Sequence, residues 1–314
     1  MSQPQQELRI DEQMPLPARR LLNVVQRLLK CSPQAARRAV IDGRVSVNRR
    51  ATQTPDSVLR VGDMVSVLPP PSFASQRNPT DETWNIVFED ELIVVVNKPA
   101  GLLTVPSPYG EKRTMISLVT RKLQESNEAA AAFSVHRLDR DVSGLLVFAK
   151  SLELAKRLRD QFAERKPERH YTAIVIGVPR DNHGTLRSYL ATDDQLNRYS
   201  VESADQGQLA ITHYRVVKSF ADAAQLDVTL ETGRRNQIRV HLAELGHPII
   251  GETRYRRQQA AHRAWPFRRL ALHAAQLAFD HPVSGQRLQF SSELPGPFHH
   301  FFRQQSRDQR HQSR

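Results

Sequence analysis

The stretch HRLDRDVSG at residues 136–144 runs directly into the apolar segment LLVFA at residues 145–149. Five consecutive apolar residues are consistent with a buried strand. The loop before it holds two arginines and two aspartates within residues 137–141, and such charges are costly to bury without partners. Because binding and catalytic residues are common in loops at strand ends, this loop is either a functional site or an exposed loop with solvated charges.

Strand patterns dominate the chain around this loop, from residue 84 to about residue 298. Two apolar runs flank Glu89-Asp90-Glu91 as in a hairpin, and further strands are predicted at residues 171–176, 211–217, 226–230 and 288–290. Two helices are expected, one capped by Ser151 and one over residues 235–245. Since strands outnumber helices and do not alternate strictly with them, the pattern predicts an α+β fold around a mostly antiparallel, mixed sheet.

The N-terminal part predicts a separate, small α+β domain. Residues 19–30 have apolar residues spaced for one helix face. Ser32 and Pro33 are typical of a helix start and Gly43 of a helix end, which predicts a second helix over residues 33–42. Short strands are expected at residues 45–47 and 61–67. The composition of residues 1–17 predicts a flexible leader, and that of residues 69–83 predicts a linker.

The positive charge is concentrated in three segments. The formal net charge is +12, whereas residues 18–50, 254–269 and 301–314 carry +8, +6 and +3, so the remainder of the chain is acidic. Clustered basic residues on an otherwise acidic protein indicate a binder of polyanions. The alternative is a solvated helix face followed by a disordered basic tail.

The composition excludes several classes of protein. One cysteine, Cys31, rules out intramolecular disulfides and zinc sites with two or more thiolates. The polar N-terminus lacks the apolar core of a secretory signal, and no apolar run approaches the ~20 residues of a membrane helix. We therefore expect a cytoplasmic protein that does not interact with membranes.

The loop at residues 136–144 resembles the signature of the RluA-type pseudouridine synthases, which reads HRLDxxTSG. Further segments resemble the motifs of this family in the expected order: NKPAGLL at 97–103, RHYTA at 169–173, TGRRNQIRVHL at 232–242, GHPIIG at 246–251 and LHA at 272–274. The similarity spans residues 84–295. Two positions depart from the motifs, Val142 in place of threonine and Asn236 in place of histidine, which suggests altered loop packing rather than lost chemistry.

The resemblance implies an RNA-modifying isomerase that breaks the bond between uracil and ribose, rotates the base and rejoins it through carbon 5. Asp139 is the expected nucleophile, since carboxylates serve in covalent catalysis, and it would attack either the sugar or the base ring. A cation keeps such a carboxylate ionised, and Arg239 is the first choice for this role, with Arg234 second. Tyr171 is expected to stack on the uracil and to help remove the proton from carbon 5.

Four residues are expected to contact the substrate. Arg137 would fill the gap left by a flipped-out uridine, and Ile238 would form an apolar wall beneath the base. His136 and Arg234 complete the set that the resemblance implies.

The segment SPQAARRAVIDGRVSVN at residues 32–48 resembles the S-four-type RNA-binding domain, a small module named after a ribosomal protein. The resemblance implies RNA contacts by a group of arginines: Arg37, Arg38, Arg44, Arg49 and Arg50. The family usually has glycine after the asparagine that corresponds to Asn48, and Arg49 stands there instead.

Other chemistries find little support. Histidine pairs such as His241 with His247 or His299 with His300 could bind metal in principle, but no HExxH motif is present, and we predict no metal site. His136, Asp139 and Ser143 do not form the GxSxG arrangement of a hydrolase. No glycine-rich phosphate loop occurs, so no cofactor is expected.

The sequence therefore predicts a leader (1–17), an RNA-binding domain (18–68), a linker (69–83), a pseudouridine synthase catalytic domain (84–300) and a basic disordered tail (301–314). The expected function is the isomerisation of specific uridines, with ribosomal RNA favoured as the substrate. The alternatives are a tRNA pseudouridine synthase and a non-catalytic protein of RNA binding or ribosome assembly. RNA is the expected partner, and we expect a monomer that needs no obligate protein partner.

Overall fold

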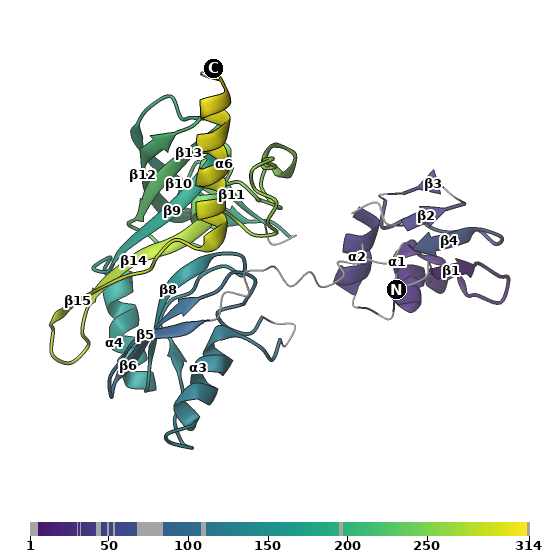
Figure 1. Cartoon of the computed structure of the whole chain (residues 1–314). Coiled ribbons are helices and arrows are strands. Elements are labelled where there is room, and N and C mark those ends of the chain that lie inside the picture. Colours follow the sequence, from purple (N-terminus) through teal and green to yellow (C-terminus); the bar gives the residue numbers. More distant parts are fainter. Residues whose placement is uncertain are drawn as a thin grey trace. The chain divides into compact units, whose positions relative to one another are not determined.

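The computed structural model describes residues 6–29, 31, 33–41, 45–48, 50–52, 54–67, 84–107, 111–194 and 197–312. The chain divides between Pro79 and Thr80 into two compact units, each with its own hydrophobic core (Figure 1). The linker expected at residues 69–83 lies outside the described residues. Of the helices that the structure describes, none is long and apolar enough to cross a bilayer.

The N-terminal unit packs two helices on an antiparallel sheet with the strand order β1-β4-β2-β3. Its core includes Leu21 and Val25 from the first helix, Val40 from the second and Val65 from the sheet, all with zero exposure. The α+β character predicted for this unit is confirmed. Its elements are β1 (Gln6–Arg9), η1 (Leu16–Arg19), α1 (Leu21–Leu29), α2 (Pro33–Ile41), β2 (Val45–Val47), β3 (Arg50–Ala51) and β4 (Met64–Val67).

The leader predicted at residues 1–17 is wrong over the part that the structure describes. Strand β1 pairs with β4, with Leu8 opposite Val65, and Ile10 is only 1% exposed. Leu8 and Ile10 alternate with charged neighbours as in a half-buried strand. This alternation covers only a few residues, and the glutamine-rich composition around it is typical of a flexible segment.

The larger unit is built around an eleven-stranded sheet, counted over the described residues. Its main path runs β11-β10-β12-β13-β9-β14-β8-β6-β5, while β15 pairs with β14 and β7 with β8. The pairing of β8 with β14 is parallel and the other pairings are antiparallel, as predicted for a mostly antiparallel, mixed sheet. The strands are β5 (Asn85–Glu89), β6 (Ile93–Lys98), β7 (Phe133–Ser134), β8 (Ser143–Ala149), β9 (Glu168–Ile176), β10 (His183–Thr192), β11 (Arg198–Val201), β12 (Gln208–Ser219), β13 (Ala223–Leu230), β14 (Leu272–Asp280) and β15 (Arg287–Ser291).

Four α-helices accompany this sheet: α3 (Met115–Gln124), α4 (Leu152–Ala163), α5 (Gln237–Glu244) and α6 (Gly296–Gln312); a short η2 (Arg257–Gln259) lies in the loop before β14. Two of them begin at side-chain caps. Ser151 accepts a hydrogen bond from the backbone N–H of Leu154 at the start of α4, as expected from the sequence. Thr114 and Ser117 form a reciprocal capping box at the start of α3.

Strand β8 is buried along its whole length because both faces of the sheet are covered there. Leu146 and Phe148 belong to the core that includes α3, whereas Leu145 and Val147 belong to the core that includes α4. This explains why the sequence shows an uninterrupted apolar run instead of alternation. The charged loop at residues 137–142 is therefore anchored to a strand that is buried along its whole length.

Gly144 allows β8 to lie against β14 at the end of this loop. Its φ is +118°, and a Cβ at this position would lie 2.2 Å from the backbone oxygen of Ala274. L-residues rarely adopt such a φ, and the contact distance excludes a side chain. The Ser-Gly end of the signature is thus a packing requirement of the parallel strand pair.

We expect Gly144→Ala to destabilise the larger unit by at least about 1–3 kcal/mol, since it combines backbone strain with a clash. Urea unfolding measures the effect. Gly285→Ala is the matched control, because Gly285 also has a positive φ (+70°) but open space around its Cα. Equal losses in the two variants would show that the β8–β14 contact contributes nothing.

The basic tail predicted to be disordered from residue 301 is also a wrong prediction, because residues 296–312 form α6. Phe298 and Phe301 have zero exposure, and Gln305 is 2% exposed. These positions follow helical spacing and form one buried face. The many arginines of this segment favour a disordered tail when composition alone is considered, although the apolar residues are spaced for a helix.

Candidate active site

The charged loop at residues 137–142 is held in place by the segment that precedes α3. The hydroxyl of Thr104 donates to the backbone oxygen of Leu138 (2.8 Å) and accepts from its N–H (3.1 Å). Lys98, 1% exposed, donates to the carbonyls of Leu102 (2.7 Å) and Arg140 (3.1 Å). Lys98 of the motif at residues 97–103 and Thr104 directly after it therefore support the loop on either side of Asp139.

Six of the seven predicted catalytic and substrate-contact residues meet in one small, open pocket of about 50 Å³. It gathers residues from the charged loop, β9, the end of β13, α5 and the start of β14. The lining consists of Arg137, Leu138, Asp139, Val142, Tyr171, Leu230, Arg234, Asn236, Gln237, Ile238, Arg239 and Leu272. The three predicted catalytic residues are among them, as are three of the four predicted substrate contacts.

Asp139 and Arg239 form the central ion pair of this pocket. The Nη1 of Arg239 lies 3.4 Å from Oδ2 of Asp139, and their side chains are 9% and 17% exposed. The guanidinium is itself fixed from behind by Glu252, which accepts hydrogen bonds from Nε and Nη2, each at 2.7 Å. Such a bidentate pair fixes the plane of the guanidinium and hence the direction in which Nη1 points.

The partners of Arg239 stabilise its protonated form. Burial alone would lower the pKa of Arg239, but the hydrogen bonds and charge of Glu252, together with Asp139, raise this pKa above its ordinary value. Burial would raise the pKa of Glu252, and Arg239 more than reverses this, so the pKa of Glu252 lies below its ordinary value. Asp139 therefore faces a permanent cation in a partly dry site.

Asn236 is positioned to hold the same arginine. It adopts φ +58° immediately before α5, a conformation that asparagine tolerates better than most residues. Its Oδ1 accepts from Nη1 of Arg239 (3.1 Å), and its Nδ2 donates to the hydroxyl of Tyr255 (2.9 Å). The Tyr255 ring in turn packs 5.4 Å from the Arg239 guanidinium carbon. Asparagine in place of the usual histidine is thus part of the support of Arg239.

The start of α5 is tied to the sheet through Gln237. Its side chain accepts from Thr232 (2.8 Å) and donates to the carbonyl of Ile211 (3.0 Å), all three groups being buried. This fixes the helix turn that presents Ile238 and Arg239 to the pocket. Val142, the other departure from the motif, is 3% exposed and packs in the apolar core beside the pocket.

Tyr171 lies on β9 and is 6% exposed. Burial raises the pKa of its phenol, the charge of Asp139 adds to this, and Arg169 opposes it. A phenol with a raised pKa is neutral at pH 7, so it can stack on a base and donate a hydrogen bond. The burial of the ring agrees with the stacking role predicted for Tyr171, and its role in removing the proton from carbon 5 stays a prediction.

His136 stands apart from the other predicted substrate contacts, since it does not line the pocket. Its ring stacks on Phe162 of α4 at 4.6 Å, and Nε2 accepts from the N–H of Val147 (3.3 Å). Burial, helped by Arg169, lowers the pKa of His136 to about 3. These contacts describe a neutral histidine that packs between the loop and α4.

We expect His136 to make the protein less stable in acid. The unfolded chain binds a proton near the ordinary value of 6.5 and the folded chain only near 3, so the stabilisation present above pH 6.5 is lost as the pH falls towards 3. His136→Gln keeps an acceptor for Val147 but cannot titrate. It should reduce the loss in unfolding free energy between pH 7 and pH 5 by about 2 kcal/mol, measured by urea unfolding. An unchanged pH dependence would contradict this assignment.

Three further arginines form a group of which one member reaches the pocket. Arg234 lines it, and Arg198 and Arg235 are close enough for their charges to interact with one another. Burial, with the charges of Arg235 and Arg234, lowers the pKa of Arg198. Like charges gathered in this way favour an anionic ligand.

No group of three or more His, Cys, Asp and Glu side chains suited to a metal occurs among the described residues. His241 is hydrogen-bonded to hydroxyl groups, with Thr212 at 2.9 Å and Ser188 at 3.0 Å.

Two residues of the site, Glu252 and Tyr255, are not predicted from the sequence. They lie just beyond the GHPIIG motif, which ends at Gly251, so the motif gives no signal for their role.

Comparisons with known proteins agree with this geometry. Residues 92–244 match the RNA pseudouridylate synthase family, and residues 19–65 match the S4 domain. The chain is 35% identical over 287 residues to the ribosomal large subunit pseudouridine synthase D of Zymomonas mobilis, covering 88% of this chain and 89% of that protein. The chain belongs to the RNA pseudouridylate synthase family. It is therefore an isomerase that acts on RNA.

Other members of the family are similar to a comparable degree. Identity is 34% to the synthase D of Pseudomonas aeruginosa, with 82% of each chain covered, and 34% to an uncharacterized RNA pseudouridine synthase of Bacillus subtilis, with 88% and 89% covered. Among solved structures, the human RNA pseudouridylate synthase domain containing 4 aligns with a TM-score of 0.60 at 25% identity, covering 71% of this chain and 93% of that one. The fold and the family predicted from the sequence are confirmed.

Proposed function

We propose that this pseudouridine synthase modifies uridines of large-subunit ribosomal RNA, with Asp139 as its nucleophile. The RNA target is supported by the names of the relatives from Zymomonas mobilis and Pseudomonas aeruginosa. The nucleophile is supported by one observation above all: the Asp139 carboxylate lies 3.4 Å from a buried, bidentately fixed Arg239 in the pocket that also contains Tyr171.

The reaction conserves every atom of the substrate. The bond between C1′ and N1 breaks, a bond between C1′ and C5 forms, C5 loses its hydrogen and N1 gains one. Asp139 supplies the electron pair for a temporary covalent bond, either to C1′ of the ribose or to the uracil ring, and recovers it when the bond to C5 has formed. No oxidant, reductant or cofactor is required by this balance.

The remaining pocket residues act on position and environment. Arg239 keeps the carboxylate of Asp139 ionised and aimed. Tyr171 stacks on the uracil, and Ile238, 5% exposed, forms the apolar wall that helps exclude water. Arg137 is exposed at the pocket and fills the helix position that the flipped uridine leaves. Arg234 and the arginines whose charges act together with it, Arg198 and Arg235, contact the flanking phosphates.

The domain assignment forms part of this proposal. Residues 18–68 would serve as the RNA-binding module and residues from 84 onward as the catalytic domain, with α6 included. Arg37 on α2 and Arg50 on β3 are exposed, and Arg37 lies 3.5 Å from Asp56 in a surface pair. Arg44, Arg49 and the side chain of Arg38 lie outside the described residues. The proposal includes a monomeric enzyme without an obligate protein partner, and the proposed substrate implies a cytoplasmic enzyme.

Mapping of pseudouridine tests the proposal. Transcripts of large-subunit ribosomal RNA and of tRNA, both free of pseudouridine, are incubated with the protein and mapped by carbodiimide adducts that resist alkali. We expect new stops in the large-subunit transcript that depend on Asp139. Stops in the tRNA transcripts alone would overturn the proposed target, and an empty map with both RNAs would overturn the proposed function.

We expect removal of residues 1–71 to weaken RNA binding and to flatten its dependence on salt, because phosphate contacts release counterions. The truncated protein should still convert uridine at saturating RNA, since the larger unit has its own core. The logarithm of Kd is measured against the logarithm of KCl concentration. A slope equal to that of the full chain would refute a role of this module in phosphate binding.

A further inference from the structure

Helix α6 has two faces of opposite character. Phe298, Phe301 and Gln305 are buried against the unit. His299, Arg303 and Arg307 are exposed and follow one another at intervals of four residues, which places them in one row along the helix. We call these three residues the α6 stripe.

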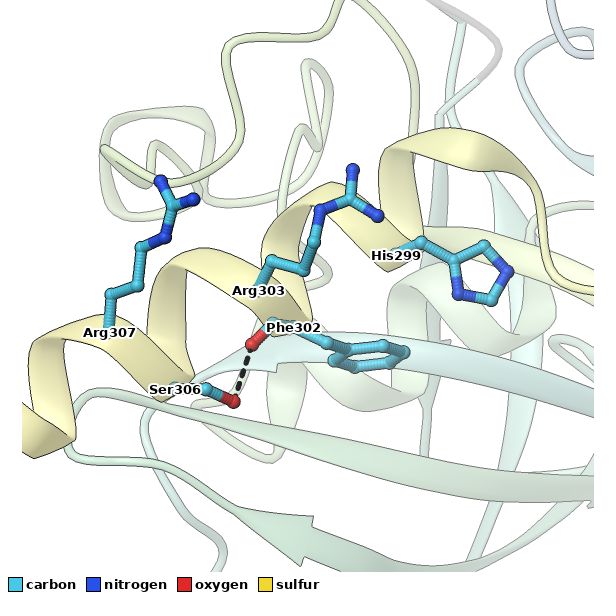
Figure 2. Close-up of a pocket in the computed structure, with 5 residues that line it drawn as sticks. All are labelled: His299, Phe302, Arg303, Ser306 and Arg307. Atoms are coloured by element: carbon cyan, nitrogen blue, oxygen red, sulfur yellow. Dashed lines mark hydrogen bonds between the residues drawn. The ribbon is translucent and has the colours of Figure 1, made fainter.

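The α6 stripe borders a shallow groove of about 350 Å³, whose lining is completed by Phe302 and Ser306. Figure 2 shows Arg303 and Arg307 extending from the same side of the helix, with Phe302 between the helix and the sheet. The hydroxyl of Ser306 donates to the backbone oxygen of Phe302 (2.9 Å) and is thus turned back on the helix. The guanidinium groups are therefore the groups of this groove that are available to a ligand.

The charge of the α6 stripe is not neutralised within the unit. Some exposed cations on other helices are paired locally, as Arg157 is with Glu153 (2.7 Å) and Lys122 with Glu125. On α6, Asp308 is engaged by Arg263 at 2.9 Å. Over the described part of the chain, no carboxylate lies within ion-pair distance of Arg303 or Arg307. An unmatched row of cations attracts a polyanion, and neither residue lines the Asp139 pocket.

We propose that the α6 stripe binds the phosphate backbone of the substrate RNA at a distance from the reacting uridine. The inference rests on the proposed function, because the enzyme's substrate is the polyanion that it must hold. Arginine suits this role, since its planar guanidinium donates two parallel hydrogen bonds to a phosphate. The stripe contributes to affinity and leaves the chemical step unchanged.

The test compares two double variants of the full chain. Arg303→Gln with Arg307→Gln removes the two guanidiniums while keeping good helix formers. Lys156→Gln with Arg157→Gln removes the same charge from the exposed side of α4 and is the matched control. Binding to an unmodified large-subunit ribosomal RNA transcript is measured between 50 and 300 mM KCl (roughly the range in which counterion release governs Kd), together with single-turnover pseudouridine formation at saturating RNA.

We expect the α6 variant to bind about 5–20-fold more weakly and to lose about 1.4–1.8 from the slope of log Kd against log salt. Its single-turnover rate should equal that of the wild type, and the control should keep the wild-type slope. An unchanged slope, or an equal loss in the control, overturns the proposal. Failure of the wild type to form pseudouridine would instead overturn the proposed function, while a slope change would still reveal the phosphate contacts.

Discussion

Asp139→Asn is expected to abolish pseudouridine formation, with a fall in the single-turnover rate on the order of 10⁴-fold or more. The amide has the size and shape of the carboxylate, but its neutral oxygen is a far weaker nucleophile than a carboxylate oxygen. Because Arg239 remains fixed by Glu252, the pocket should keep its geometry. The measurement is single-turnover conversion of a large-subunit ribosomal RNA transcript at saturating enzyme.

Binding and folding serve as controls for this variant. The Kd for the same RNA should stay within about 3-fold of wild type, since the phosphate contacts that dominate affinity are unchanged. The thermal unfolding midpoint reports whether the pocket has remained intact. Substantial residual conversion by a folded Asp139→Asn protein would remove Asp139 from the role of nucleophile.

Glu252→Gln is expected to damage both stability and catalysis. Glu252 has zero side-chain exposure and is the bidentate partner of Arg239, and removal of one member of a buried ion pair costs about 3–5 kcal/mol. In the protein that remains folded, the guanidinium of Arg239 has lost its bidentate partner and can shift towards Asp139. The carboxylate of Asp139 is then less available as a nucleophile. We expect a loss of about 10²-fold in kcat, the scale associated with misplacement of a catalytic group.

Two measurements separate positioning from mere destabilisation. Glu153→Gln breaks an exposed pair with Arg157 and should cost less than about 1 kcal/mol with no change in kcat. The kcat of Glu252→Gln is determined well below its unfolding temperature, and a positioning role requires that kcat falls more than KM rises. Wild-type kcat in a folded Glu252→Gln protein would show that Glu252 has no part in aiming Arg239.

The motifs predicted the pocket well because they lie at the ends of strong elements. Asp139 precedes the fully buried β8, Tyr171 lies within β9, and Arg239 lies on α5. The apolar patterns predicted these elements, and the family resemblance predicted that their residues share one site. His136 could not be separated from Asp139 in this way, because the packing of its ring on Phe162 depends on α4, a helix that the sequence motif does not include.

Elements with weak apolar patterns escaped prediction. Strand β10 is mostly exposed or half-buried, so hydrophobic alternation gives it little signal, and its pairing with β12 provides the stability instead. Helix α6 also has a weak apolar pattern. Its buried face depends mainly on two phenylalanines, and the rest of the segment is highly charged. Glu252 was missed because its role depends on a partner 13 residues away that only the folded chain brings opposite.

The separation of Asp139 from Arg239 by 100 residues along the chain has a consequence for synthesis and refolding. Contacts between residues so far apart in the sequence form late in folding, because closing a long loop has a large cost in conformational entropy. A nascent chain can pair β8 with β6 and form α4 long before α5 and Glu252 have emerged, so it carries the nucleophile without the cation that holds it. Recovery of activity after denaturant dilution should therefore lag behind recovery of secondary structure.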